Sequence, residues 1–144
     1  MVNDDTIKLL KECNAGVKMA VSSIDELLDK VQDESLKNRL IENKNDHTKL
    51  GDQTHQLLLE YHDQDKEPNA IAKAMSWMKT NYSMMKNNSD SEVAKLIIDG
   101  STMGIQSLKN YLDQYQAADE QSKGITKKLI HIEETLSTDL QKYL

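Results

Sequence analysis

One histidine lies on an apolar helix face and is the residue best placed to do chemistry. Leu36, Leu40, Leu50 and Tyr61 repeat at helical spacing, and at 100° per residue His47 falls within roughly 20° of the line through them. An imidazole in that position faces the interior of a helical bundle, where such folds build their sites. His47 is therefore the first candidate for a metal ligand or an acid/base.

Two interpretations of His47 stay open. It could act on a ligand, or it could be a core histidine whose ring is satisfied by Asn14 of the first predicted helix or by another polar neighbour. The inner stripes carry no carboxylate beside it, although Glu133, at the edge of the last predicted helix, could reach inward. His47 and Glu133 are the candidate ligands for iron or zinc, while we expect no cofactor and predict no catalytic residue.

A di-metal carboxylate centre is not predicted. Such a centre needs about four carboxylates and two histidines pointing inward, with Glu-x-x-His on two helices. The sequence contains no Glu-x-x-His. His55 and His131 lie away from the apolar stripes, His62 falls in a polar loop, and the acids at i±3 from them, Asp52 and Glu134, turn outward with them. These residues are expected to be solvated.

Cys13 falls on the inner stripe of the first predicted helix. A buried thiol behaves as a small hydrophobic group with a raised pKa, so we interpret Cys13 as a packing residue. Several methionines also repeat at helical spacing and are predicted to fill the core, or to line a groove for an apolar ligand. They are Met75, Met78, Met84, Met85 and Met103.

Composition excludes several classes of protein. The chain has 144 residues, one Cys, no Phe, and 18 Lys and Arg against 24 Asp and Glu, for a net charge of −6. One Cys excludes an internal disulfide framework and any multi-Cys zinc site. The acidic balance, with Arg39 as the only arginine, argues against nucleic acid. With no apolar run of membrane-spanning length and no signal sequence, we expect a cytoplasmic protein.

Helical periodicity runs through the whole sequence, and no strand pattern appears. We predict an all-α, up-down four-helix bundle with a short or broken third helix, forming a single domain over residues 1–144. Pro68 marks the start of the third element, which lets the chain cross the bundle before the last two long helices. Ser89 and Glu92 have capping-box spacing and indicate a new helix start, although one kinked helix over residues 70–116 is the alternative. The predicted elements cover about 4–31, 36–61, 68–85, 90–116 and 125–143.

Two features of the 90–116 segment concern its neighbours. Gly100 and Gly104 form a GxxxG pattern, which we interpret as the close approach of another helix. Ile98, Ile105 and Leu112 repeat every seven positions on the flank of the main apolar face. That stripe predicts a homodimer, or else a wider core contact.

The sequence resembles the ferritin-like superfamily, most closely an uncharacterised bacterial branch of small ferritin-like four-helix bundles. The resemblance rests on three stretches: 14–18, 66–78 and 89–105. It implies a ferritin-like bundle, often dimeric, with iron or another metal as a family property. The chain departs from the pattern at Lys18, at Ser101 and at Glu134-Thr135-Leu136-Ser137, so no ligand set is carried over.

These observations favour a non-enzymatic binding or interaction scaffold that lacks a complete di-metal centre. The alternative is a metal-binding ferritin-like protein with a reduced site around His47. A third hypothesis is an apolar small ligand. We predict no nucleic-acid partner and no membrane span.

Overall fold

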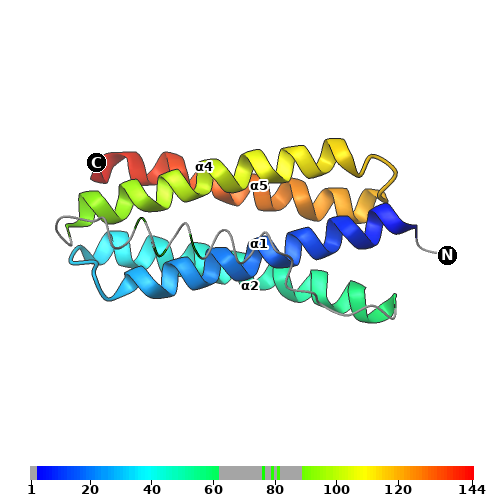
Figure 1. Ribbon diagram of the computed structural model, residues 1–144. Coiled ribbons are helices and arrows are strands. Elements are labelled where there is room, and N and C mark those ends of the chain that lie inside the picture. Colours follow the sequence, from blue (N-terminus) through cyan, green and yellow to red (C-terminus); the bar gives the residue numbers. More distant parts are fainter. Residues whose placement is uncertain (1–2, 62–75, 77–78, 80, 82–88) are drawn as a thin grey trace.

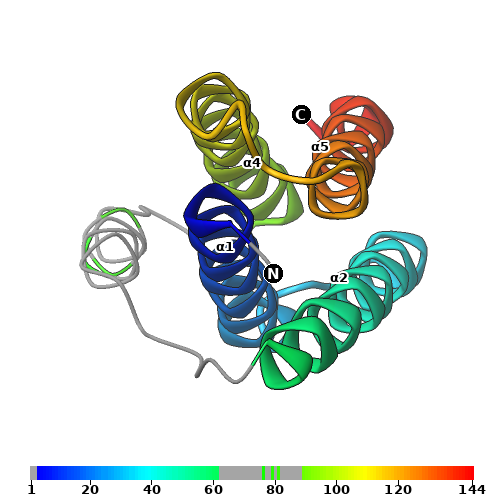
Figure 2. The same ribbon diagram turned by 90° about the vertical axis from the view of Figure 1, so that its right-hand side faces the viewer.

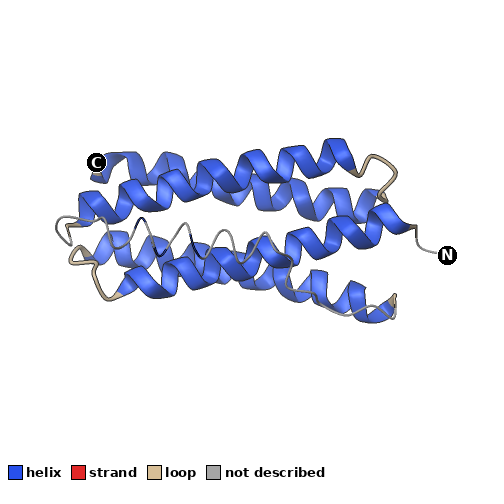
Figure 3. Cartoon of the chain, in the orientation of Figure 1, coloured by secondary structure: helices blue, strands red, loops and turns tan. Residues whose placement is uncertain are grey.

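The computed structural model describes residues 3–61, 76, 79, 81 and 89–144, and in these residues it contains long helices and no strand (Figures 1 and 3). The long helices are α1 (Asp4–Leu28), α2 (Glu34–Glu60), α4 (Asp90–Gln114) and α5 (Glu120–Leu140), and α5 is followed by the 3₁₀ turn η1 (Gln141–Tyr143). The prediction of an all-α bundle is confirmed. In this part of the chain no helix is long and apolar enough to cross a membrane.

Each long helix begins at a polar residue that caps it. The side-chain oxygens of Asn3, Asp33, Ser89 and Asp119 each accept a hydrogen bond from the backbone N–H three residues on, at 2.8 to 3.2 Å. These bonds satisfy amides that have no partner within the helix.

Ser89 decides between the two predictions for residues 70–116. Its backbone is extended, with φ −80° and ψ 154°, so α4 starts as a new helix and does not continue an earlier one through a kink. The length of the element predicted over 68–85 lies outside the described residues. Within it, Ser76, Lys79 and Asn81 have helical backbone.

The helices form two antiparallel hairpins that pack against each other. α1 packs mainly on α2, and α4 mainly on α5; α1 then faces α4, and α2 faces α5 (Figure 2). Asp90 joins the hairpins at one end, because its carboxylate accepts from the backbone N–H groups of Gln32 and Asp33 at 2.8 and 3.0 Å. α2 and α4 therefore start at the same end and run in the same direction. The chain from Tyr61 to Ser89 joins opposite ends of the bundle, in agreement with the predicted crossing.

The opposite end of the bundle is held by a latch between the start of α1 and the α4–α5 loop. Asn3 Nδ2 donates to the carbonyl of Ala117 at 2.7 Å, and the N–H of Ala117 donates to Asp5 at 3.0 Å. The N–H of Asp119 donates to Thr6 Oγ1 at 2.8 Å. Backbone groups of the loop are thus satisfied by side chains of α1.

The interior consists of two aliphatic clusters. One is centred on Leu9, Leu10 and Leu58, and the other on Ile24, Leu36 and Leu140. Ile98, Ile105 and Leu112 are partly buried and pack against these clusters. These three residues therefore widen the contact of α4 with the core. They do not support the homodimer, which stays a prediction.

The glycines differ in what they face. A Cβ at Gly51 of α2 would lie 2.8 Å from Val17 Cγ1 of α1, so this glycine permits a close contact between the two helices. A Cβ at Gly104 of α4 or at Gly16 of α1 would meet no atom within 4 Å in the described structure. The close helix approach predicted from Gly100 and Gly104 is therefore not found at Gly104.

Candidate functional site

His47 is buried in the middle of the bundle and hydrogen-bonded through both ring nitrogens. Its side chain is 2% exposed. Nδ1 lies 3.0 Å from the backbone carbonyl oxygen of Asn43, one turn earlier in α2. Nε2 lies 2.6 Å from Oε1 of Glu133, whose side chain is 12% exposed. His47 is thus a satisfied core histidine, and of the partners that the sequence left open, Asn14 or another polar neighbour, it is other neighbours, Asn43 and Glu133, that hold the ring.

These contacts fix how many protons the pair holds. A carbonyl oxygen only accepts, so Nδ1 of His47 carries a hydrogen and donates it to Asn43. The contact between Nε2 and Oε1 needs one further hydrogen, which belongs either to an imidazolium or to a carboxylic acid. In both cases His47 and Glu133 together carry no net charge.

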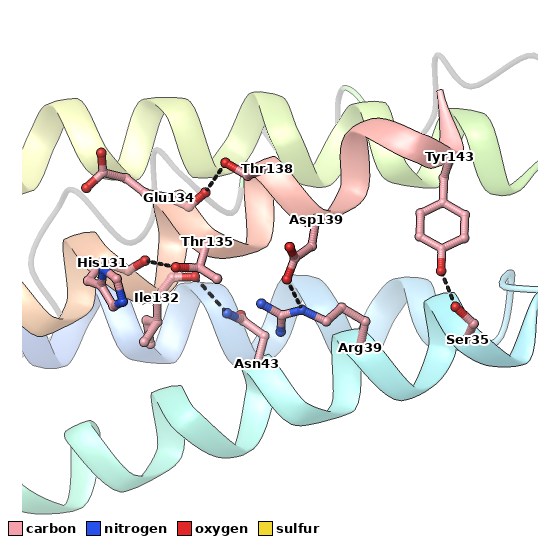
Figure 4. Close-up of polar contacts among 10 residues, drawn as sticks. All are labelled: Ser35, Arg39, Asn43, His131, Ile132, Glu134, Thr135, Thr138, Asp139 and Tyr143. Carbon is pink, nitrogen blue, oxygen red and sulfur yellow. Dashed lines mark hydrogen bonds and ion pairs between the residues drawn. The ribbon is translucent and has the colours of Figure 1, made fainter.

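Asn43 is a second polar residue at the same place. Its Nδ2 donates to the backbone carbonyl of Ile132 in α5 at 3.1 Å, which fixes the orientation of the side-chain amide (Figure 4). The residue is 1% exposed, and its Oδ1 has no hydrogen-bond partner among the described residues. A buried acceptor without a donor is costly, by about 1–3 kcal/mol.

Further contacts of α2 with α5 and with the following turn η1 hold Glu133 in register with His47. Arg39 Nε donates to Asp139 at 2.7 Å, and the hydroxyl groups of Ser35 and Tyr143 are hydrogen-bonded to each other (Figure 4). Together with the bond from Asn43, these contacts follow the seam between the two helices. They bring Glu133 level with His47, which lies about two helical turns after Arg39 in α2.

A cavity of about 310 Å³ lies between α1 and α4, with Asn43, His47 and Glu133 in its lining. Its size is at the lower end of the range for small-molecule sites. Most of its lining is apolar, and the walls formed by α1 and α4 both include very small side chains among larger ones. These wall residues are Ala15, Gly16 and Ala20 on α1 and Gly100, Ser101 and Gly104 on α4.

Glu12 of α1 and Tyr111 of α4 also line this cavity. The Tyr111 hydroxyl is hydrogen-bonded to Glu12, and burial together with the neighbouring Glu12 carboxylate raises the pKa of Tyr111 to about 12. Tyr111 is therefore neutral at physiological pH and donates to the carboxylate. Its ring stacks on Tyr115, with centroids 6.2 Å apart.

Cys13 lies outside the cavity, on the face of α1 that meets α5. It is fully buried, and its Sγ is 3.1 Å from Oγ1 of Thr126. Burial raises the pKa of the Cys13 thiol to about 12. The prediction of a buried packing thiol is confirmed.

The other candidates are separated from His47. His55 and His131 are exposed, as predicted, and so are Asp52 and Glu134. Met103 was predicted to fill the core but is 47% exposed, and it is one of the residues that line the cavity. His62 and the remaining methionines of that predicted cluster lie outside the described residues.

The donor groups do not fit a di-metal centre or a tetrahedral zinc. In the described ranges no three side chains of His, Cys, Asp or Glu come together as metal ligands. Two donors each bound about 2.05 Å from a tetrahedral zinc lie about 3.3 Å apart. His47 Nε2 and Glu133 Oε1 are 2.6 Å apart, which is a hydrogen-bond distance.

The sequence pointed to His47 and Glu133 but not to the cavity beside them. The available signal was a pair of small-residue stripes at i and i+4, Gly16 and Ala20 on one helix and Gly100 and Gly104 on another. Read together, they show that both walls of one helix interface lack side-chain volume. Glu12 gave no such signal, since a single acid in an amphipathic helix is typical of a solvated face.

Comparisons of the chain with protein-family models, with curated proteins and with solved structures found no match. The function therefore has to be argued from the geometry of the cavity.

Proposed function

We propose that the protein is a non-enzymatic binding scaffold, built on a ferritin-like bundle, whose cavity between α1 and α4 takes a small and mostly apolar molecule. The direction of the helices supports the ferritin-like part of this proposal. α2 and α4 run in the same direction, and one long connection joins them, as in ferritin-like folds.

The observation that carries the binding function is the cavity itself. Helix pairs normally fill the space between them, because an unfilled apolar space costs stability. Here small residues of both helices line the space over about one turn of each, and the cavity reaches the buried Asn43, His47 and Glu133. An apolar wall with a few convergent polar groups is the usual form of a ligand site.

The test fills the cavity without disturbing the fold. Gly104→Leu places a side chain where the described structure leaves room, and leucine favours a helix more than glycine does. We expect this variant to fold and to lose binding of a neutral apolar dye such as N-phenyl-1-naphthylamine, measured by fluorescence. Gly124→Leu is the matched control, because Gly124 of α5 also faces open space but lies outside this cavity. Equal dye binding by both variants and the unaltered chain would refute the proposal.

A second candidate function is binding of one iron or zinc ion at His47 and Glu133, which requires the two side chains to move apart from the 2.6 Å hydrogen-bond distance between Nε2 and Oε1. The observation in its favour is the bond from Nδ1 to a backbone carbonyl, which is how metal-binding histidines are oriented. Elemental analysis after expression in iron- and zinc-supplemented medium tests it. Stoichiometric metal that is lost in His47→Ala would establish this function in place of the first.

A further inference from the structure

The polar end of the cavity contains more acceptors than donors. The Nδ1 hydrogen of His47 is given to the carbonyl of Asn43, and Nδ2 of Asn43 donates to the carbonyl of Ile132. Two acceptor atoms have no donor within the described structure. They are Oδ1 of Asn43 and the second carboxylate oxygen of Glu133. A molecule that fits this end must therefore donate hydrogen bonds, which excludes a head group that only accepts.

The charge of the lining residues indicates which kind of hydrogen-bond-donating head group the cavity favours. Glu12 and Glu133 are acids, and no lysine or arginine is found among the described residues that line the cavity. Since His47 and Glu133 are neutral as a pair, Glu12 leaves the lining negative wherever the shared proton lies. The whole chain has a net charge of −6, which adds to this potential. A carboxylate or phosphate head group is thus disfavoured, and a cation is favoured.

The register of the helices shows that Glu133 and Glu12 lie at different levels along the cavity. Lys44 of α2 pairs with Asp25 of α1, so Asn43 lies beside the later part of α1. Thr126 of α5 contacts Cys13 of α1, and Glu133 follows seven residues later in a helix that runs parallel to α1. At 1.5 Å per residue, the level of Glu133 is therefore about 12 Å along the bundle from Glu12. Between these levels the walls are formed by the small residues of α1 and α4.

We propose that the ligand is a linear aliphatic amine. Its ammonium group donates to Oδ1 of Asn43 and to the Glu133 carboxylate, and its alkyl chain lies between the small-residue walls and points toward Glu12. This inference rests on the proposed function, because it assigns the head group and the orientation of the apolar molecule in the same cavity. An ammonium supplies three donors, which match the unpartnered acceptors at this end of the cavity, and a positive charge, which matches the net negative charge that Glu12 gives the lining.

The experiment compares three ligands of equal chain length: decylamine, decan-1-ol and decanoate. Binding to the full chain is measured at pH 7 by calorimetry, where an alkylamine is protonated. We expect decylamine to bind at least tenfold more tightly than decanol, and decanoate to bind most weakly. Equal affinity for amine and alcohol, or a preference for decanoate, overturns the inference but leaves the proposed function standing. No binding of any of the three, together with no dye binding, removes the proposed function itself.

Two variants test where the head group lies. Glu133→Gln keeps the size of the side chain and a hydrogen bond to His47 but removes the carboxylate, so we expect at least a tenfold loss of decylamine affinity. Glu12→Gln removes a carboxylate at the other end of the same cavity and should cost less than threefold. Equal losses, or a larger loss in Glu12→Gln, overturn the assigned position. The ligand ranking on the unaltered chain decides the class of head group even if Glu133→Gln does not fold.

Discussion

α1 packs closely against α2 but leaves open space toward α4. Toward α2, Gly51 accepts the branched side chain of Val17, and a Cβ at Gly51 would lie 2.8 Å from it. Toward α4, Gly16 of α1 and Gly104 of α4 face open space within the described structure. A glycine opposite a large residue brings helices together, whereas glycines on both sides leave a cavity. The meaning of a small residue thus depends on the residue across the interface, which sequence spacing within one helix does not reveal.

The largest expected effect comes from overfilling the tight interface. Gly51→Leu forces a large side chain against Val17, which is itself buried and stiff at χ1, and should lower the free energy of unfolding by about 3 kcal/mol. Urea denaturation followed by circular dichroism measures this. Gly104→Leu is the matched substitution at the open interface and should not destabilise the protein. If both variants lose the same stability, the contrast between the two faces of α1 is wrong.

An effect of comparable size over the pH range between 9 and 11 concerns Cys13, on the face of α1 that meets α5. Its pKa rises from 9.0 to about 12 in the folded protein, so the unfolded chain loses the thiol proton first. The stability contributed by the neutral thiol is complete below pH 9 and is lost as pH rises toward 12, by about 1.4 kcal/mol per pH unit. Denaturation between pH 8 and 11 measures the slope.

The control for that slope is Cys13→Ala. Tyr61, Tyr111 and Tyr115 also have raised pKa values and lose stability with rising pH in the alkaline range. Only the difference between the unaltered chain and Cys13→Ala reports the thiol. An identical pH dependence for the two proteins would show that Cys13 is accessible to solvent.

The smallest effect is a gain in stability at the open interface. Gly104→Ala adds a methyl group where nothing lies within 4 Å among the described residues, and alanine favours a helix by about 1 kcal/mol over glycine. We expect a gain of about that size in the free energy of unfolding. Gly51→Ala should show no such gain, because its methyl group meets Val17. A loss of stability in Gly104→Ala would mean that the cavity is closed at this point.

Much of the fold could be predicted from local sequence. Apolar spacing and the capping-box spacing of Ser89 and Glu92 are properties of single segments, and they placed the ends of the helices to within about five residues. His47 was assigned to the interior by its phase with respect to Leu40 and Leu50. These predictions succeeded because helix formation and amphipathicity are decided within one element.

The features that the sequence did not predict depend on how two helices pack against each other. The partner of His47 is set by the register of α5 on α2, which the bonds of Asn43 to Ile132 and of Arg39 to Asp139 fix. Helical periodicity placed Asn14 on the inner face of its helix, but it did not show how far along the bundle Asn14 lies from His47. The cavity was missed for the same reason, since it arises from the pairing of two helices that are far apart in sequence.

The latch at the start of α1 has a consequence for how the bundle opens. Asn3, Asp5 and Thr6 bond to a loop more than 110 residues away in sequence, whereas each hairpin is held mostly by contacts between consecutive helices. Contacts of such long range form late in folding and are among the first to be lost in local unfolding. The amide protons of Ala117 and Asp119 should therefore exchange with solvent at the rate at which the two hairpins separate, and a molecule bound between α1 and α4 would slow that exchange.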